Sequence, residues 1–165
     1  MNQDWRDELL KARMGGGRIV ILGVGNSQRG DDAAGGLVVR KLRKLIGKRP
    51  EQRMLILDGG ETPESLTGEI RKFGPSLVLI VDAAASGHKP GTIYVVDRDK
   101  IGHDDLTTHR IPLTLLIKYL EDSVGCRVEI IGIEPENLGL SDPVSGKVSA
   151  SISLLARELA KILNS

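Results

Sequence analysis

The stretch "RIVILGVGNSQRGDD", residues 18–32, decides the fold because it joins a buried strand to a glycine-rich turn. The apolar run at residues 18–24 predicts the strand, and the next segment, "GLVVRKLRKLI", has the apolar spacing of a helix. A strand, a glycine turn and a helix in this order open an α/β domain. Such a turn usually cradles a phosphate, yet this one ends in two adjacent aspartates, Asp31 and Asp32.

Strands and helices continue to alternate along the rest of the chain. Further strands are predicted at residues 54–58, 77–82, 92–97 and 127–133, and helical patterns at 62–73, 112–124 and 145–165. Only about nine residues connect the third and fourth strands, whereas a parallel crossover needs about a dozen or more. We therefore expect a mainly parallel α/β sandwich whose fourth strand, residues 92–96, runs antiparallel at or near an edge.

Composition limits the class of protein. The 165 residues suit one domain, which we place at residues 18–165, after an N-terminal extension and glycine linker at residues 1–17. A net charge of +1 gives no field for nucleic acid or an anionic membrane surface. No apolar run has the length of a membrane span. The single cysteine, Cys126, excludes an internal disulfide, so we expect a cytoplasmic protein.

The two aspartates argue against a phosphate ligand, because carboxylates repel phosphate at close range. The turn also fits neither common phosphate motif, since its glycine spacing is too long for G-x-G-x-x-G and it has no lysine after Gly30. Asp82 ends the third strand, and the loop after the fourth strand can bring His109 back to the same carboxyl edge. Asp32, Asp82 and His109 could then bind a metal ion. Alternatively, one aspartate caps the helix and the other is solvated.

Several segments together resemble the nickel–iron hydrogenase maturation endopeptidases. They are "ILGVGNSQRGDDAAG", "LDGGETPE", "LVLIVDAA", "HKPGTIYVVD", "LTTHRIPL" and "IIGIEPE". The resemblance covers nearly everything from residue 18 to the last helix, and is strongest to the branch that matures energy-conserving, formate-hydrogenlyase-type enzymes. It implies a three-layer α/β/α sandwich around a twisted five-stranded mixed sheet with one antiparallel strand.

The resemblance also implies a function. Members of the family remove a C-terminal extension from the hydrogenase large-subunit precursor after nickel insertion. By position, the metal ligands would be Asp32, Asp82 and His109, with nickel met on the substrate. The family's "DGG" element, linked to substrate selection, falls on Asp58, Gly59 and Gly60. Many relatives have glycine where this chain has Ala33.

The chemistry stays open at this point. The nickel could assist hydrolysis as a Lewis acid, or it could be a recognition element while a carboxylate activates water. Ser27 is a weaker alternative as nucleophile, because the elbow motif requires glycine where Arg29 stands. We expect a structural role for Cys126. Two other functions are a nucleotide-binding module and a chaperone that holds the large subunit without cleaving it.

Overall fold

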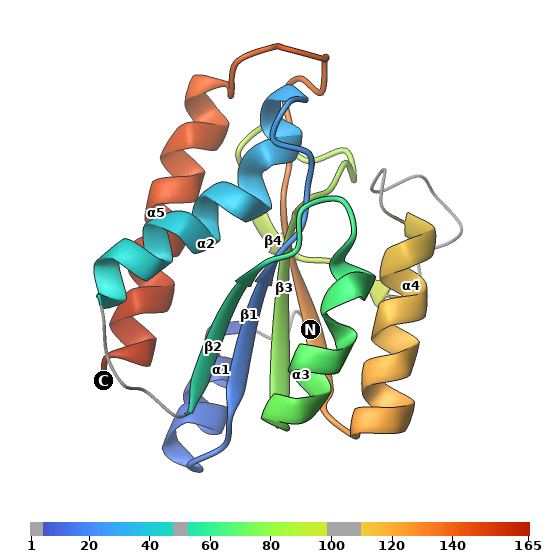
Figure 1. Ribbon diagram of the computed structural model, residues 1–165. Helices are drawn as coiled ribbons and strands as arrows, with labels where there is room; N and C mark the ends of the chain where they lie inside the picture. Colours follow the sequence, from blue (N-terminus) through green and yellow to red (C-terminus); the bar gives the residue numbers. More distant parts are fainter. Residues whose placement is uncertain (1–4, 48–52, 99–109) are drawn as a thin grey trace.

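One mixed sheet forms the centre of the molecule in the computed structural model, which describes residues 5–47, 53–98 and 110–165. Its five strands lie in the order β2-β1-β3-β5-β4 (Figure 1). The pairs formed by the first four of these strands are parallel. The bounds are β1 Ile19–Gly23, β2 Met54–Asp58, β3 Leu77–Ala83, β4 Ile93–Val95 and β5 Arg127–Ile133.

The fourth strand confirms the antiparallel prediction. β4 pairs antiparallel with β5 at the edge of the sheet, with Tyr94 opposite Gly132. It is shorter than expected, three residues in place of the predicted five. The connection before it contains no helix, because too few residues separate β3 from β4 for a parallel crossover.

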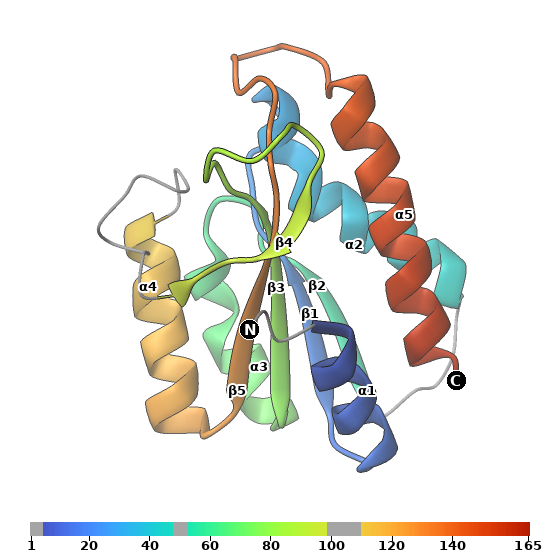
Figure 2. The ribbon, with the colours of Figure 1, turned by 180° about the vertical axis from the view of Figure 1, so that it is seen from behind.

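Helices cover both faces of the sheet (Figures 1 and 2). One face carries α1, α2 and α5, and the other carries α3 and α4. Short 3₁₀ turns, η1 and η2, lead into α2 and α3, and a π-helical turn, η4, follows α4. The bounds are α1 Trp5–Met14, η1 Gly30–Ala33, α2 Ala34–Ile46, η2 Pro63–Leu66, α3 Thr67–Phe73, α4 Arg110–Tyr119, η4 Leu120–Val124 and α5 Gly146–Leu163.

The alternation of side chains along the strands explains the three layers. In β1, Ile19 and Ile21 belong to the apolar cluster beneath α2 and α5, whereas Val20 and Leu22 belong to the cluster beneath α3 and α4. All four are at most 1% exposed. A strand buried on both faces needs a continuous apolar run, which is why the segment before the glycine turn shows no polar alternation.

The N-terminal helix packs on the body of the protein. Trp5 and Leu9 of α1 join the same apolar cluster as α5, while Leu10 remains 41% exposed. Glu8, which is also buried, lies 2.7 Å from the Arg127 guanidinium at the start of β5. No helix in the described ranges has the length and apolarity that a bilayer crossing requires.

Gly35 brings α2 close to the carboxyl edge of the sheet. A Cβ atom on Gly35 would lie 2.2 Å from the Val81 carbonyl oxygen and 2.3 Å from that of Val24. Only glycine permits this approach, so the start of α2 lies directly over the ends of β1 and β3. The aspartate pair before α2 is thereby held at that edge.

We expect Trp5→Ala to lower the free energy of unfolding by about 3 kcal/mol, because it removes a large buried side chain. Leu10→Ala, in the same helix but exposed, should cost less than about 1 kcal/mol. Denaturant unfolding of both variants measures the difference. Equal, small losses would show that α1 is not part of the core.

Candidate active site

Asp31 connects two loops that are far apart in the sequence. Its Oδ2 accepts hydrogen bonds from the backbone N–H groups of Glu136 and Asn137, at 2.8 and 3.0 Å, and from Ser145 Oγ at 2.9 Å. Its Oδ1 accepts from Ser145 N at 2.7 Å. The side chain is fully buried, and these bonds replace the water that it gives up. Asp31 therefore joins the glycine turn to the loop between β5 and α5.

Asp32 lies directly beside this anchor in η1 and is 2% exposed. Its Oδ2 accepts a hydrogen bond from Asn26 N at 3.0 Å, across the turn. Neither aspartate caps α2, whose N-cap residue is Ala33, and neither is solvated. The alternative that one aspartate caps the helix while the other is solvated is therefore wrong. Ala33 itself has φ −74°, which alanine adopts without strain, so the exchange from glycine is tolerated.

The glycine turn has few backbone N–H groups to offer a phosphate. Most of them donate to acceptors inside the protein, including Asp32 Oδ2, Asn26 Oδ1 and the Gly60 carbonyl oxygen. The donors are Gly25, Asn26, Gln28, Arg29, Asp31 and Asp32. A phosphate cradle needs such groups directed at the ligand. The turn is thus built to position aspartates.

Asp82 is placed as the sequence predicts, at the carboxyl end of β3 and 1% exposed. β1 and β3 are neighbours, so Asp32 and Asp82 follow adjacent strands at one edge of the sheet. His109 lies outside the described residues. Within the described ranges, no group of three His, Cys, Asp or Glu side chains is arranged to hold a metal ion. The two buried carboxylates are oxygen donors of the kind that divalent cations accept.

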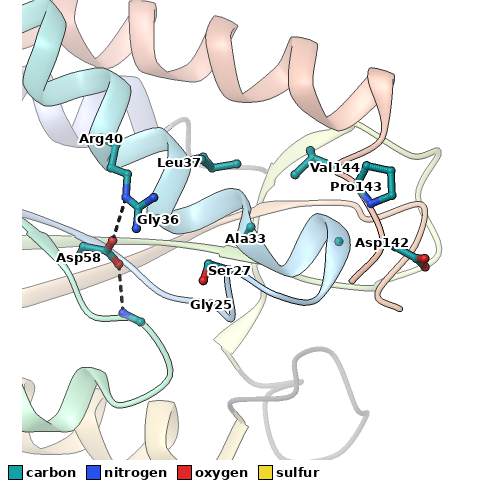
Figure 3. A pocket seen from close by; sticks show the side chains of 12 residues that line it. Gly25, Ser27, Ala33, Gly36, Leu37, Arg40, Asp58, Asp142, Pro143 and Val144 are labelled. Carbon is teal, nitrogen blue, oxygen red and sulfur yellow. Dashed lines mark hydrogen bonds and ion pairs between the residues drawn. The ribbon is translucent and has the colours of Figure 1, made fainter. Parts of the chain in front are cut away.

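A pocket of about 380 Å³ opens beside the glycine turn (Figure 3). Asp58 and Gly60 form part of its wall, together with Arg40 from α2. The Asp58 carboxylate accepts from Gly60 N at 3.1 Å and lies 3.4 Å from Arg40 Nε. The remaining wall comes from the glycine turn, the first turns of α2 and residues 142–144. Gly59 N donates to the Gly23 carbonyl oxygen, which ties this element to β1.

Comparison with known proteins identifies the family. The sequence profile described as hydrogenase maturation protease matches residues 37–163. The chain is 36% identical over 141 residues to the hydrogenase 3 maturation protease of Escherichia coli K12, covering 85% of this chain and 87% of that protein. The chain belongs to the hydrogenase maturation protease family. It is therefore a peptide-bond hydrolase, and the hydrogenase 3 relative agrees with the predicted branch.

Solved structures of proteases in this family share the fold. The crystal structure of the NiFe hydrogenase maturation protease HycI from Thermococcus kodakarensis KOD1 has 37% identity and a TM-score of 0.82, covering 95% of this chain and 99% of that one. The solution structure of the endopeptidase HycI from Escherichia coli has 34% identity and a TM-score of 0.74, covering 87% and 90%. The predicted sandwich with one antiparallel strand is confirmed.

A second polar cluster in this protease was not predicted from the sequence. Glu134, 5% exposed, accepts hydrogen bonds at its Oε1 from the N–H groups of Ser86, at 2.8 Å, and His88, at 3.1 Å. The Tyr94 hydroxyl donates to the Ala84 carbonyl oxygen at 2.5 Å. These bonds fix the connection that directly follows Asp82. Since most acceptors and donors are backbone groups, no side-chain motif marks the cluster.

The two alternative nucleophiles differ in position. Ser27 is exposed and lines the pocket, but the structure gives its hydroxyl no hydrogen bond to a described residue. Cys126 is 6% exposed and precedes β5, so it lies at the opposite end of the parallel strands from Asp82. Burial raises the pKa of its thiol, which favours the unreactive protonated form. These features support the structural role expected for Cys126.

We expect Asp31→Ala to lower the free energy of unfolding by about 3 kcal/mol or more, because the donors in the β5–α5 loop lose their acceptor. A mere helix cap would cost only about 1 kcal/mol. Asp122→Ala, at an exposed position of η4, is the control and should change stability by less than about 0.5 kcal/mol. Denaturant unfolding distinguishes the two cases, and a loss near that of a cap would contradict the anchoring role.

The Tyr94 hydroxyl should lose its proton at a higher pH than an ordinary tyrosine. Burial raises its pKa from 10.0 to about 12; the Ser86 hydrogen bond opposes the shift, and the negative charges of Glu134 and Asp82 add to it. The folded protein then keeps this proton between pH 10 and 12, so the free energy of unfolding falls as pH rises through that window. Tyrosinate absorbance and urea unfolding against pH measure both effects. Tyr94→Phe should remove this part of the slope, and an unchanged slope would contradict it.

Proposed function

We propose that this protease removes the C-terminal extension from the large-subunit precursor of a nickel–iron hydrogenase after nickel has been inserted. The observation that carries the proposal is the pair of buried carboxylates, Asp32 and Asp82, at the ends of adjacent parallel strands. The pocket beside the glycine turn offers room for a peptide segment at the same edge. We place the reaction in the cytoplasm, in keeping with the free, buried thiol of Cys126.

In this proposal Asp32, Asp82 and His109 contact nickel that arrives with the precursor. When bound, the nickel supplies positive charge that complements the two carboxylates and can polarise a nearby carbonyl. A carboxylate of the pair accepts a proton from water as the water oxygen adds to the scissile carbonyl carbon. The leaving amine takes up a proton as the C–N bond breaks. Asp58 and Gly60 line the pocket, and Gly59 between them is bonded to the Gly23 carbonyl oxygen, so we assign these three residues a role in selecting the substrate.

The mass of the precursor after incubation distinguishes a protease that cleaves it from a chaperone that only binds it. The purified protease is incubated with nickel-loaded and with nickel-free large subunit, and the mass of each subunit is then determined. We expect only the nickel-loaded subunit to lose its C-terminal segment. A stable complex at full mass would instead indicate a chaperone. A thermal shift with nucleotides would support the nucleotide-binding alternative, which the occupied N–H groups of the turn disfavour.

We expect Asp82→Asn, Asp32→Asn and His109→Ala each to lower cleavage by about 10²-fold or more, as loss of a general base or charge partner typically does. The asparagine variants keep side-chain volume, so near-UV circular dichroism should remain that of the native fold. Asp122→Asn serves as the matched control and should cleave at the native rate. Full activity of the Asp82 or Asp32 variant would overturn the assignment of that residue.

A further inference from the structure

The loop between β5 and α5, residues 134–145, exposes two leucines beside the candidate site. Leu138 is 37% exposed and Leu140 is 66% exposed. Glu136 and Asp142, on either side of them, are exposed as well, whereas residues 137 and 139 are half-buried. Ser141 and Pro143 are exposed too. We call Glu136, Leu138, Leu140 and Asp142 the outer face of this loop.

Hydrogen bonds to the glycine turn hold the loop in one conformation, and this conformation keeps the two leucines exposed. Besides the bonds to the Asp31 carboxylate, Asp31 N donates to the Asn137 carbonyl oxygen at 3.0 Å. Ser141 N donates to the Gln28 carbonyl oxygen at 2.7 Å. Ser141 has φ +65°, a conformation that costs energy in a residue other than glycine and persists only where surrounding contacts impose it.

The glycine turn and this loop also touch directly at Gly30. A Cβ atom there would lie 2.1 Å from Asn137 Oδ1, and Gly30 has φ +55°. The two loops therefore behave as one unit at the carboxyl edge. Apolar side chains that a rigid loop keeps in water are typical of a surface that a partner covers.

The outer face is continuous with the pocket. Asp142, Pro143 and Val144 line that pocket together with Ser27 of the glycine turn and Ala33 at the end of η1 (Figure 3). A protein that covers Leu138 and Leu140 would therefore lie at the mouth of the space where the peptide is expected. Neither Glu136 nor Asp142 forms an ion pair within the described part of the chain. Their charges are available to basic groups on a partner.

We propose that the outer face of the β5–α5 loop is a docking surface for the hydrogenase large-subunit precursor, which would meet it with an apolar patch bordered by lysine or arginine. This role rests on the endopeptidase function proposed above. The leucines supply apolar contact, and the two carboxylates orient the partner. Because Asp31 joins the same loop to Asp32, a subunit held here is positioned relative to the candidate catalytic carboxylates.

The test measures cleavage of the nickel-loaded precursor as a function of its concentration. Leu138→Ser/Leu140→Ser should raise KM about tenfold or more, the loss expected when contact residues of an interface are truncated. The rate at saturating precursor should stay within about twofold, since no catalytic group changes. Leu45→Ser is the matched control, because Leu45 is 49% exposed at the far end of α2. Its KM should remain native.

A second pair of variants tests the charges. Glu136→Lys/Asp142→Lys should raise KM strongly at low salt and less at high salt, because exposed charges are screened. Glu69→Lys, on an exposed position of α3, is the control and should leave KM unchanged. Thermal unfolding should show all variants folded, since the replaced side chains are exposed.

The outcomes separate the two proposals. If the native protease leaves the nickel-loaded precursor uncut, the proposed function fails. If the native protease cleaves but the leucine double variant has the same KM as Leu45→Ser, the docking surface is overturned. A fall in the saturated rate without a change in KM would also overturn it, since the loop would then act on the catalytic step. Binding of the precursor to Asp82→Asn, measured by calorimetry with and without the leucine substitutions, checks KM independently.

Discussion

The hydrogen bonds to the Asp31 carboxylate are the constraint on which the candidate site depends. A buried carboxylate without donors is strongly unfavourable, so the β5–α5 loop must approach closely enough to supply them. The donors come from residues 105 to 114 positions further along the chain. One charged group thus links the first βα turn to the loop before the last helix. The position of Asp32, its neighbour in the sequence, follows from that link.

The adjacent aspartates have different tasks. The carboxylate of Asp31 accepts from four donors of the β5–α5 loop, whereas that of Asp32 accepts from Asn26 N across the glycine turn. A P-loop places lysine after its glycine to attract phosphate, and it leaves the amides of the turn available. Here the amides are used within the protein. The same strand–turn–helix framework therefore presents a carboxylate instead of binding an anion.

Much of this arrangement can be predicted from the sequence by general rules for connecting strands in a sheet. Connection length predicts the antiparallel β4, and the convergence of parallel strand ends places Asp32 and Asp82 at one edge, as the structure has them. The anchoring role of Asp31 could not be predicted, because most of its partners are backbone N–H groups that leave no residue signature. The Glu134 and Tyr94 contacts were missed for the same reason. His109, which the sequence places at this edge, stays a prediction.

The short edge strand has a consequence for motion. β4 has three paired residues and a neighbour on one side only, whereas β5 beside it is held on both sides. Elements with so few interstrand bonds open at a lower free energy than the centre of a sheet, and their amide hydrogens exchange first. Asp82 lies in β3, which is paired on both sides, so its amide hydrogen should exchange more slowly than those of β4.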